Sequence, residues 1–154
     1  MNKAARITLR PATEADREIL YRWRSDPTVR ANSFHTQEIP FADHCVWFEK
    51  LMRDPSRMQF IAESDGEAVG QIRFAIEDQE ALISYSIDGE KRGRGLGTAL
   101  LEALAAKLRG DARVLRLVGD VKKGNTASRR AFLRAGFAEQ GPDEAGNYRY
   151  TLEN

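Results

Sequence analysis

The segment Arg92-Gly93-Arg94-Gly95-Leu96-Gly97 places three glycines within five residues of a 154-residue chain. It follows an apolar, strand-like run from Leu82 to Ile87 and precedes a leucine-rich pattern with helical spacing. Glycine lets the backbone take dihedral angles that strain other residues, and it lets a ligand approach the main chain closely. The unpaired amides of a first helical turn, Gly95 to Thr98, attract an anion because the helix dipole is positive there. The segment therefore predicts a phosphate or pyrophosphate site at a strand-to-helix junction.

Two other phosphate-binding motifs fail on their spacing. A dinucleotide fingerprint needs G-x-G-x-x-G, whereas this segment reads G-x-G-x-G. A P-loop needs G-x-x-x-x-G-K-S/T; Gly119 and Gly124 have that glycine spacing, but Asn125 stands where the lysine belongs. Lys91 and Arg94 add positive charge beside the glycines, which suits an anion. On this segment alone, a tight turn into a helix without any ligand remains the alternative.

Strand and helix patterns alternate around this turn. Apolar and alternating runs predict strands at residues 7–9, 60–62, 69–76, 82–87, 114–121, 137 and 148–152. Helical spacing predicts helices after Thr13, from Gly95, over 125–135, and over 41–52 with an apolar face of Phe41, Cys45, Phe48 and Met52. Residues 26–40 contain two prolines and no clean period, so we expect a loop there.

The resulting order is β-α-α-β-β-β-α-β-α-β-β. It predicts an α/β (α+β) fold with one mixed sheet flanked by helices. Within it, residues 82–121 form a β-α-β unit whose strands are parallel, so the glycine turn lies at its crossover.

Composition indicates one ordinary globular domain over residues 1–154. Hydrophobic residues make up 42% of the chain and charged residues 31%, which is too apolar for a disordered protein. The 24 basic residues nearly balance the 23 acidic ones, and a net charge of +1 argues against a general nucleic-acid binder. Cys45 is the single cysteine, which excludes an intrachain disulfide and a cysteine-based zinc site. No run approaches the roughly 18 apolar residues of a membrane helix, so we expect a cytoplasmic protein without a membrane or nucleic-acid partner.

Two segments resemble the signatures of the GNAT superfamily of acetyltransferases. The segment Ile87 to Gly97 is similar to its acetyl-CoA motif, R/Q-x-x-G-x-G/A after a strand, with Arg92, Gly95 and Gly97 at the fixed positions. Further along, the segment from Asn125 to Phe137 resembles the second signature, N-x-x-A/S-x-x-x-Y/F-x-K/R-x-G-F. The two motifs together imply the GNAT fold, whose central mixed sheet is mostly antiparallel and flanked by helices, and a single acetyltransferase domain.

The resemblance implies acetyl-CoA as the acetyl donor and no metal. The backbone of Tyr85, Ser86 and Ile87 would pair with the pantetheine arm like an added strand. The pyrophosphate would lie on Arg92, Gly93, Arg94, Gly95, Leu96, Gly97 and Thr98. Asn125 would bond the pantetheine amide or the region near the sulfur. Ser128 and Arg129 would lie toward the far side of the donor, near its phosphates.

The expected reaction is attack of a neutral amine on the acetyl thioester, which needs alignment, a polarised carbonyl and removal of a proton. A backbone N–H of the strand 82–87 can polarise the carbonyl. As catalytic side chains we expect Asn125, Ser84 and Glu80, the last acting as a base through water. Many relatives have a tyrosine acid where this chain has Phe132, which we expect to be a core residue.

Three stretches, residues 23–30, 33–36 and 44–49, are similar to GNAT enzymes that acetylate nucleotide-linked 4-amino-sugars, especially those of the pseudaminic-acid pathway. Residues 70–74 point to the same enzymes. The three stretches also resemble, more loosely, the enzymes that acetylate ribosomal-protein N-termini. The resemblance implies a small-molecule amine acceptor, first of all a nucleotide sugar, held by Asn32, Phe34, His35, Gln71 and Arg73. A protein α-amine acceptor and a non-catalytic acyl-CoA-binding module are the alternatives. Many relatives dimerise, which leaves a homodimer open.

Overall fold

The glycine turn joins the strand β4 (Glu80–Ile87) to the helix α4 (Leu96–Leu108). The other strands are β1 (Thr8–Pro11), β2 (Arg57–Ser64), β3 (Glu67–Glu77), β5 (Arg116–Val121), β6 (Ala138–Gln140) and β7 (Tyr148–Glu153). The other helices are α1 (Arg17–Ser25), α2 (Pro27–Asn32), α3 (Phe41–Arg53) and α5 (Thr126–Arg134), with 3-10 turns at Glu14–Asp16 and Gly89–Lys91.

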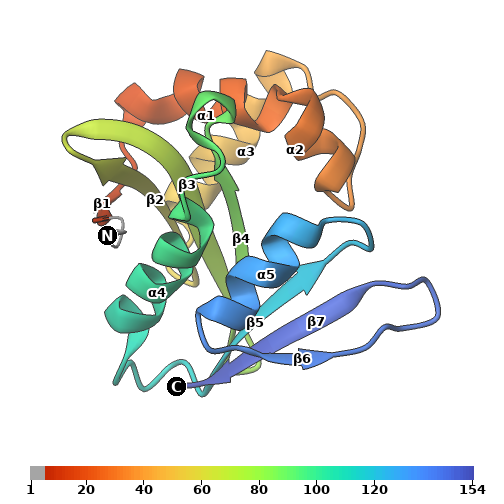
Figure 1. Ribbon diagram of the computed structural model, residues 1–154. Coiled ribbons are helices and arrows are strands. Elements are labelled where there is room, and N and C mark those ends of the chain that lie inside the picture. The colour runs from red at the N-terminus through yellow and green to blue at the C-terminus, as the bar shows by residue number, and fades with distance from the viewer. Residues whose placement is uncertain (1–5) are drawn as a thin grey trace.

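The computed structural model describes residues 6–154, and within them seven strands form one sheet in the order β1-β2-β3-β4-β5-β7-β6 (Figure 1). Neighbouring strands run antiparallel, except for the parallel pair β4 and β5. The mixed, mostly antiparallel sheet is therefore confirmed, and so is the parallel β-α-β unit. In this part of the chain no helix combines the length and the apolar character needed to cross a membrane.

Helices pack on both faces of the sheet. Successive side chains of a strand point to opposite faces, so the alternate residues of β2 divide the interior into two cores. Phe60 and Ala62 pack in the larger core with the leucines of α4, whereas Ile61 packs with Leu20 of α1 and Phe48 of α3. The carboxyl end of β4, the central strand, meets both helix layers: it leads into α4, and Asp88 just beyond it accepts a hydrogen bond from Trp23 Nε1 of α1 at 2.8 Å.

The prediction of a loop over residues 26–40 is wrong for its first part, where α2 forms. Asp26 caps this helix, since its Oδ1 accepts hydrogen bonds from the amides of Thr28 at 2.8 Å and Val29 at 3.2 Å. Pro27 occupies the first helical position, where its missing N–H costs nothing. The helix buries no residue, so it has no apolar period that sequence spacing could reveal.

The predicted apolar face of α3 is also wrong in part. The buried residues are His44, Phe48 and Leu51, whereas Phe41 is 42% exposed and Met52 is 43% exposed. The imidazole of His44 is accommodated because its Nε2 donates a hydrogen bond to the carbonyl oxygen of Arg17 at 2.9 Å. His44 is therefore buried on the inner face of α3 because its polar ring is hydrogen-bonded, although a search for apolar residues alone does not place it there.

Candidate active site

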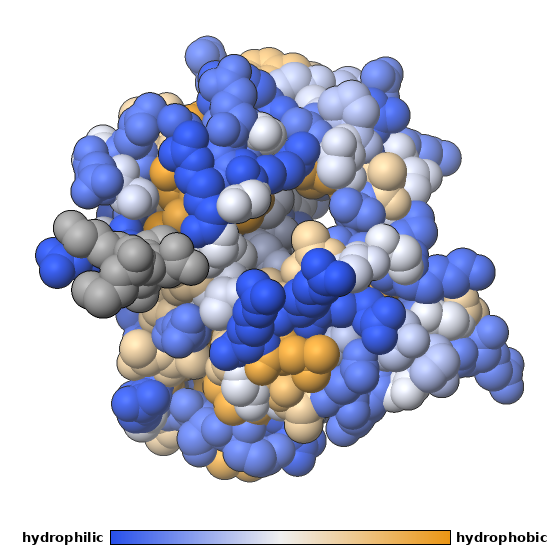
Figure 2. Space-filling view, viewed as in Figure 1, coloured by the Kyte–Doolittle hydropathy of each residue, from blue (hydrophilic) through white to orange (hydrophobic). Residues whose placement is uncertain are grey.

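β4 and β5 separate part of the way along their length. Their parallel pairing joins Glu80–Ile83 to Arg116–Gly119 and stops there, while β3 still pairs with β4 as far as Ile87. On the side facing β5, residues 84–87 present a backbone edge without a strand partner in the described chain, and they line a cavity of about 650 Å³. In the space-filling view of Figure 2, a hollow bordered by hydrophilic side chains lies near the middle of the molecule. An open strand edge is a template for an extended ligand.

Phe132 of α5 packs where the two strands part. A Cβ atom at Gly119, the last residue of β5 that pairs with β4, would lie 2.2 Å from Cζ of the Phe132 ring. The ring stacks on Tyr150 with 5.1 Å between centroids and is 2% exposed. Phe132 is therefore a core residue, as expected, and residue 119 must be glycine for the ring to fit.

The glycine turn gives α4 an open amino end. Gly95 has a φ of 74° and caps α4, a left-handed conformation that glycine adopts without strain. The amides of Leu96, Gly97 and Thr98 precede the first helical hydrogen bond, from Ala99 N to Gly95 O at 3.3 Å. All three residues line the cavity, so the unpaired donors of the first turn lie at its wall. The sequence predicts an anion site at this turn, and the open amino end of α4 has the geometry that such a site requires.

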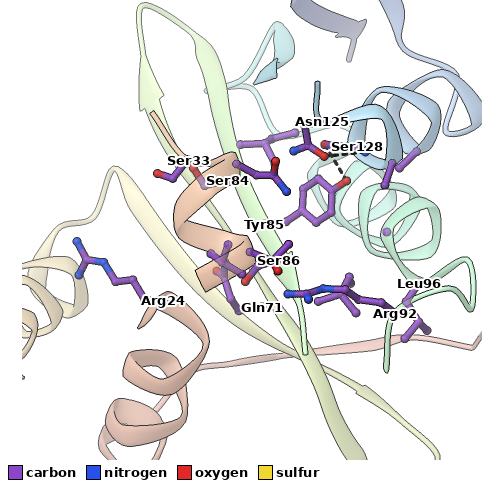
Figure 3. Close-up of a pocket in the computed structure, with 18 of the residues that line it drawn as sticks. Arg24, Ser33, Gln71, Ser84, Tyr85, Ser86, Arg92, Leu96, Asn125 and Ser128 are labelled. Atoms are coloured by element: carbon purple, nitrogen blue, oxygen red, sulfur yellow. Dashed lines mark hydrogen bonds between the residues drawn. The ribbon is translucent and has the colours of Figure 1, made fainter. Parts of the chain in front are cut away.

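The start of α5 lies beside this turn. Asn125 caps α5, because its Oδ1 accepts a hydrogen bond from the amide of Ser128 at 3.3 Å. The Ser128 hydroxyl is bonded to the Tyr85 hydroxyl at 2.9 Å, which joins α5 to β4 (Figure 3). Burial raises the pKa of Tyr85, so its phenol is neutral at physiological pH. A Cβ at Gly97 would lie 3.3 Å from the Tyr85 oxygen, so the amino ends of α4 and α5 and the side chain of Tyr85 are closely packed.

Most residues predicted to hold the donor line the cavity: Tyr85, Ser86, Ile87, Arg92, Gly93, Gly95, Leu96, Gly97, Thr98, Asn125 and Ser128. Arg94 and Arg129 do not line it. The Arg129 guanidinium stacks 3.7 Å from the Tyr148 ring centroid and its Nε donates to the Tyr150 hydroxyl at 3.2 Å, so it points toward β7. Arg130 and Arg134 line the cavity instead, since they lie on the other face of α5.

Of the three predicted catalytic side chains, Ser84 and Asn125 line the cavity and Glu80 does not. Glu80 lies at the opposite end of β4, four residues before Ser84 and so about 13 Å away along the strand. Its carboxylate accepts a hydrogen bond from Arg116 Nη1 at 3.1 Å. Among the described residues that line the cavity, the carboxylate is that of Asp120, just beyond the point where the strands part. It accepts hydrogen bonds from Arg149 Nε at 2.8 Å and Nη2 at 3.0 Å.

All five residues predicted for the acceptor line the cavity: Asn32, Phe34, His35, Gln71 and Arg73. The loop after α2 is fixed over the site, because Lys122 Nζ donates to the carbonyl oxygens of Ala31 at 3.2 Å and Ser33 at 3.3 Å. Phe34 on this loop is 52% exposed, so it does not belong to the core. Gln71 is buried and donates to Ser86 Oγ at 3.1 Å, which joins the floor of the acceptor side to β4.

Arg24 and Trp47 also line the cavity, although the sequence did not single them out as site residues. The Arg24 guanidinium lies 4.3 Å from the Trp47 ring centroid, and that of Arg73 lies 5.1 Å from it. Burial, together with the positive charges of Arg24 and Arg57, lowers the pKa of Arg73 to about 10. Burial also lowers the pKa of Arg24. Both guanidinium groups stay charged at neutral pH, so this part of the cavity is strongly positive.

Comparison with known proteins places the chain among acetyltransferases. Residues 6–138 match a family model described as an acetyltransferase (GNAT) domain. The chain is 24% identical over 153 residues to the L-amino acid N-acetyltransferase AaaT of Escherichia coli strain K12, which covers 96% of this chain and 90% of that protein.

Solved structures share the fold at low sequence identity. The spermidine N-acetyltransferase of Vibrio cholerae, in complex with CoA and spermine, has a TM-score of 0.85 at 16% identity and covers 96% of this chain and 95% of its own. The ribosomal L7/L12 α-N-protein acetyltransferase RimL, in complex with CoA, has a TM-score of 0.81 at 18% identity. The match covers 99% of this chain and 96% of RimL. The N-acetyltransferase PseH of Campylobacter jejuni has a TM-score of 0.71 at 20% identity, and the match covers 96% of this chain and 97% of PseH. At such identities the likeness concerns the fold.

Proposed function

We propose that this chain, which belongs to the GNAT family and is an acetyl-CoA-dependent N-acetyltransferase, acetylates a small-molecule primary amine. The acceptor that we consider first is a nucleotide-linked 4-amino-sugar. The observation that supports acetyl-CoA as the donor is the free edge of β4 at residues 84–87, which leads directly to the open amino end of α4. One cavity wall thus offers both a strand edge for an extended arm and helix amides for a diphosphate.

The donor suits this wall along its whole length. The amide groups of a pantetheine arm can pair with the backbone of residues 84–87 as an added strand would. Its diphosphate suits the amides of Leu96 to Thr98, with Lys91 and Arg130 at the cavity wall to balance the charge. A Cβ at Gly93 or Gly95 would meet no atom within 4 Å, so nothing blocks the approach of a ligand to the backbone there.

Side chains near the point where the strands part serve the transfer. Acetyl-CoA supplies an activated acetyl group, and the acceptor amine must lose a proton when it attacks. Asp120 can take that proton directly or through water, while Arg149 holds its carboxylate in place. Ser84 and Asn125 contribute polar groups to the same cavity. Phe132 has no proton to give, so the departing thiolate takes its proton from water or another group, or leaves unprotonated, because its thiol has a reference pKa of about 8.5.

The acceptor side favours a small molecule over a protein chain. The loop after α2 is tied to the end of β5 by Lys122 and lies over the site, which encloses the acceptor side. A cavity of about 650 Å³ is in the range of small-molecule sites. The exposed ring of Phe34 offers a surface on which a nucleotide base can stack.

The test is release of CoA thiol from acetyl-CoA by the purified protein with a panel of primary amines. The panel contains a nucleoside-diphosphate amino sugar, an amino acid, a peptide with a free N-terminus, a polyamine and an aminoglycoside. We expect turnover with the amino sugar at a kcat/KM at least about tenfold above that of the peptide. Preference for the peptide would favour the protein acceptor. Tight acetyl-CoA binding without turnover on any amine would favour a non-catalytic binding module and overturn the proposal.

A further inference from the structure

A pair of arginines lies in the cavity away from the glycine turn. Arg24 comes from α1 and Arg73 from β3, and both lie beside the ring of Trp47 on α3. Figure 3 shows Arg24 on the opposite side of Gln71 from Tyr85 and Ser128. The pair therefore belongs to the acceptor side, and the phosphates of a donor on α4 do not account for it.

Neither arginine is neutralised by the part of the chain that the structure describes. Two other arginines at the cavity have carboxylate partners, since Arg30 pairs with Glu38 at 3.2 Å and Arg92 with Asp26 at 3.3 Å. Within residues 6–154, Arg24 and Arg73 have no carboxylate within 4.0 Å, and the guanidinium group of Arg73 donates no hydrogen bond to a protein atom. Two partly buried charges of the same sign repel each other and cost folding free energy. An arrangement of this kind is explained by a ligand that supplies the missing negative charge.

His44 holds Arg24 in this position. Its Nε2 donates to the carbonyl oxygen of Arg17 at 2.9 Å, which leaves the lone pair on Nδ1 to accept a hydrogen bond from Arg24 Nη1 at 3.3 Å. The imidazole is fully buried between α1 and α3. The Arg24 guanidinium is therefore oriented before any ligand arrives, and its other donors are free to face the cavity.

We propose that Arg24 and Arg73 bind an anionic group of the acceptor, a phosphate or a carboxylate, with Trp47 as the wall beside it. This inference rests on the proposed function, and it specifies the substrate class: an amine that also carries negative charge. Guanidinium groups suit both anions because their planar fork donates two parallel hydrogen bonds. Polyamines and other polycations are excluded from the site by repulsion from the same two charges.

Calorimetric titration of the CoA-saturated protein tests the proposal without requiring turnover. Saturation with CoA blocks the glycine turn, so an added anion must bind elsewhere. Separate titrations with UDP and with L-glutamate distinguish a phosphate from a carboxylate, and spermine serves as the cationic probe. We expect one of the two anions to bind and spermine not to bind. Arg73→Gln should weaken anion binding at least about tenfold, and Arg73→Lys should weaken it less, because it keeps the charge.

Arg57→Gln is the matched control, since Arg57 is a nearby charge on β2 that does not line the cavity. Anion affinity should change less than about threefold in this variant, and CoA affinity should be unchanged in all variants. Equal weakening by Arg57→Gln and Arg73→Gln, or binding of spermine in place of both anions, would overturn the proposal. A ligand-free melting temperature of Arg73→Gln well below that of the wild type would also overturn it, because Arg73 would then serve the fold. If an anion binds as expected but no amine is acetylated, the proposed function fails and the anion site stands.

Discussion

At the scale of single residues, His44 links the stability of the fold to the state of the acceptor site. Burial lowers its pKa from the reference value of 6.5, and the charges of Arg24 and Arg17 lower it further. The unfolded chain therefore takes up a proton at a higher pH than the folded chain does. The stabilisation is complete above pH 6.5 and is lost as the pH falls toward the lower pKa of the folded state.

Unfolding in urea between pH 8 and pH 5 measures this effect. We expect the midpoint to fall between pH 7 and pH 5 in the wild type, and to fall less in His44→Gln. His35→Gln is the control, because His35 is exposed on the loop after α2. In this variant the change of the urea midpoint with pH should equal that of the wild type. If the urea midpoint of His44→Gln changes with pH as much as that of the wild type, His44 does not titrate in this range.

Arg24 shows what a sequence can and cannot reveal about a single residue. Leu20 and Trp23 are buried on α1, and Arg24 follows Leu20 by four residues, which places its charge beside the apolar face of the helix. A cation at such a position is a signal for a site residue, and sequence reasoning missed it. The meeting of Arg24 with Arg73 could not have been predicted, because it depends on how α1 packs against the sheet.

At the scale of secondary-structure elements, the amino end of α4 was predictable and the surroundings of β4 were only partly so. Glycine at residues 93, 95 and 97 marks the strand-to-helix turn locally, so that turn was placed correctly. The direction in which each side chain points was harder to place. Glu80, just before the predicted strand, begins the observed β4 at the end away from the cavity. Arg129 lies on the predicted helix but on the face away from the cavity.

Substitutions at Gly97 test the anion site of α4. In Gly97→Asp, a carboxylate in the first helical turn would occupy the place of the diphosphate, and we expect acetyl-CoA affinity to fall at least about a hundredfold. Gly97→Ala is the matched control, since its Cβ has the same 3.3 Å approach to the Tyr85 oxygen without the charge. Its affinity should fall less than about tenfold. An acidic first turn is favourable for a helix, so both variants should melt at similar temperatures. Equal affinities in the two variants would place the diphosphate elsewhere.

At the scale of the whole molecule, the site results from one irregularity in the sheet. The pairing of β4 with β5 ends at Ile83 and Gly119, and the ring of Phe132 packs against that glycine. The gap beyond this point lies between the layer of α4 and α5 and the layer of α1 to α3, and residues from both layers line it. The sequence predicts both strands and their parallel direction, but the residue at which they part depends on contacts between distant segments.

Hydrogen–deuterium exchange with and without CoA tests the donor site most directly. CoA that lies along the free edge of β4 must protect backbone amides in residues 84–87 and in the first turn of α4, at Leu96 to Thr98. We expect slower exchange in these two segments and little change in β1, the edge strand of the sheet beyond β2 and β3. Exchange of both segments at the ligand-free rate, under conditions where calorimetry shows CoA to be bound, would contradict the donor site proposed for this acetyltransferase.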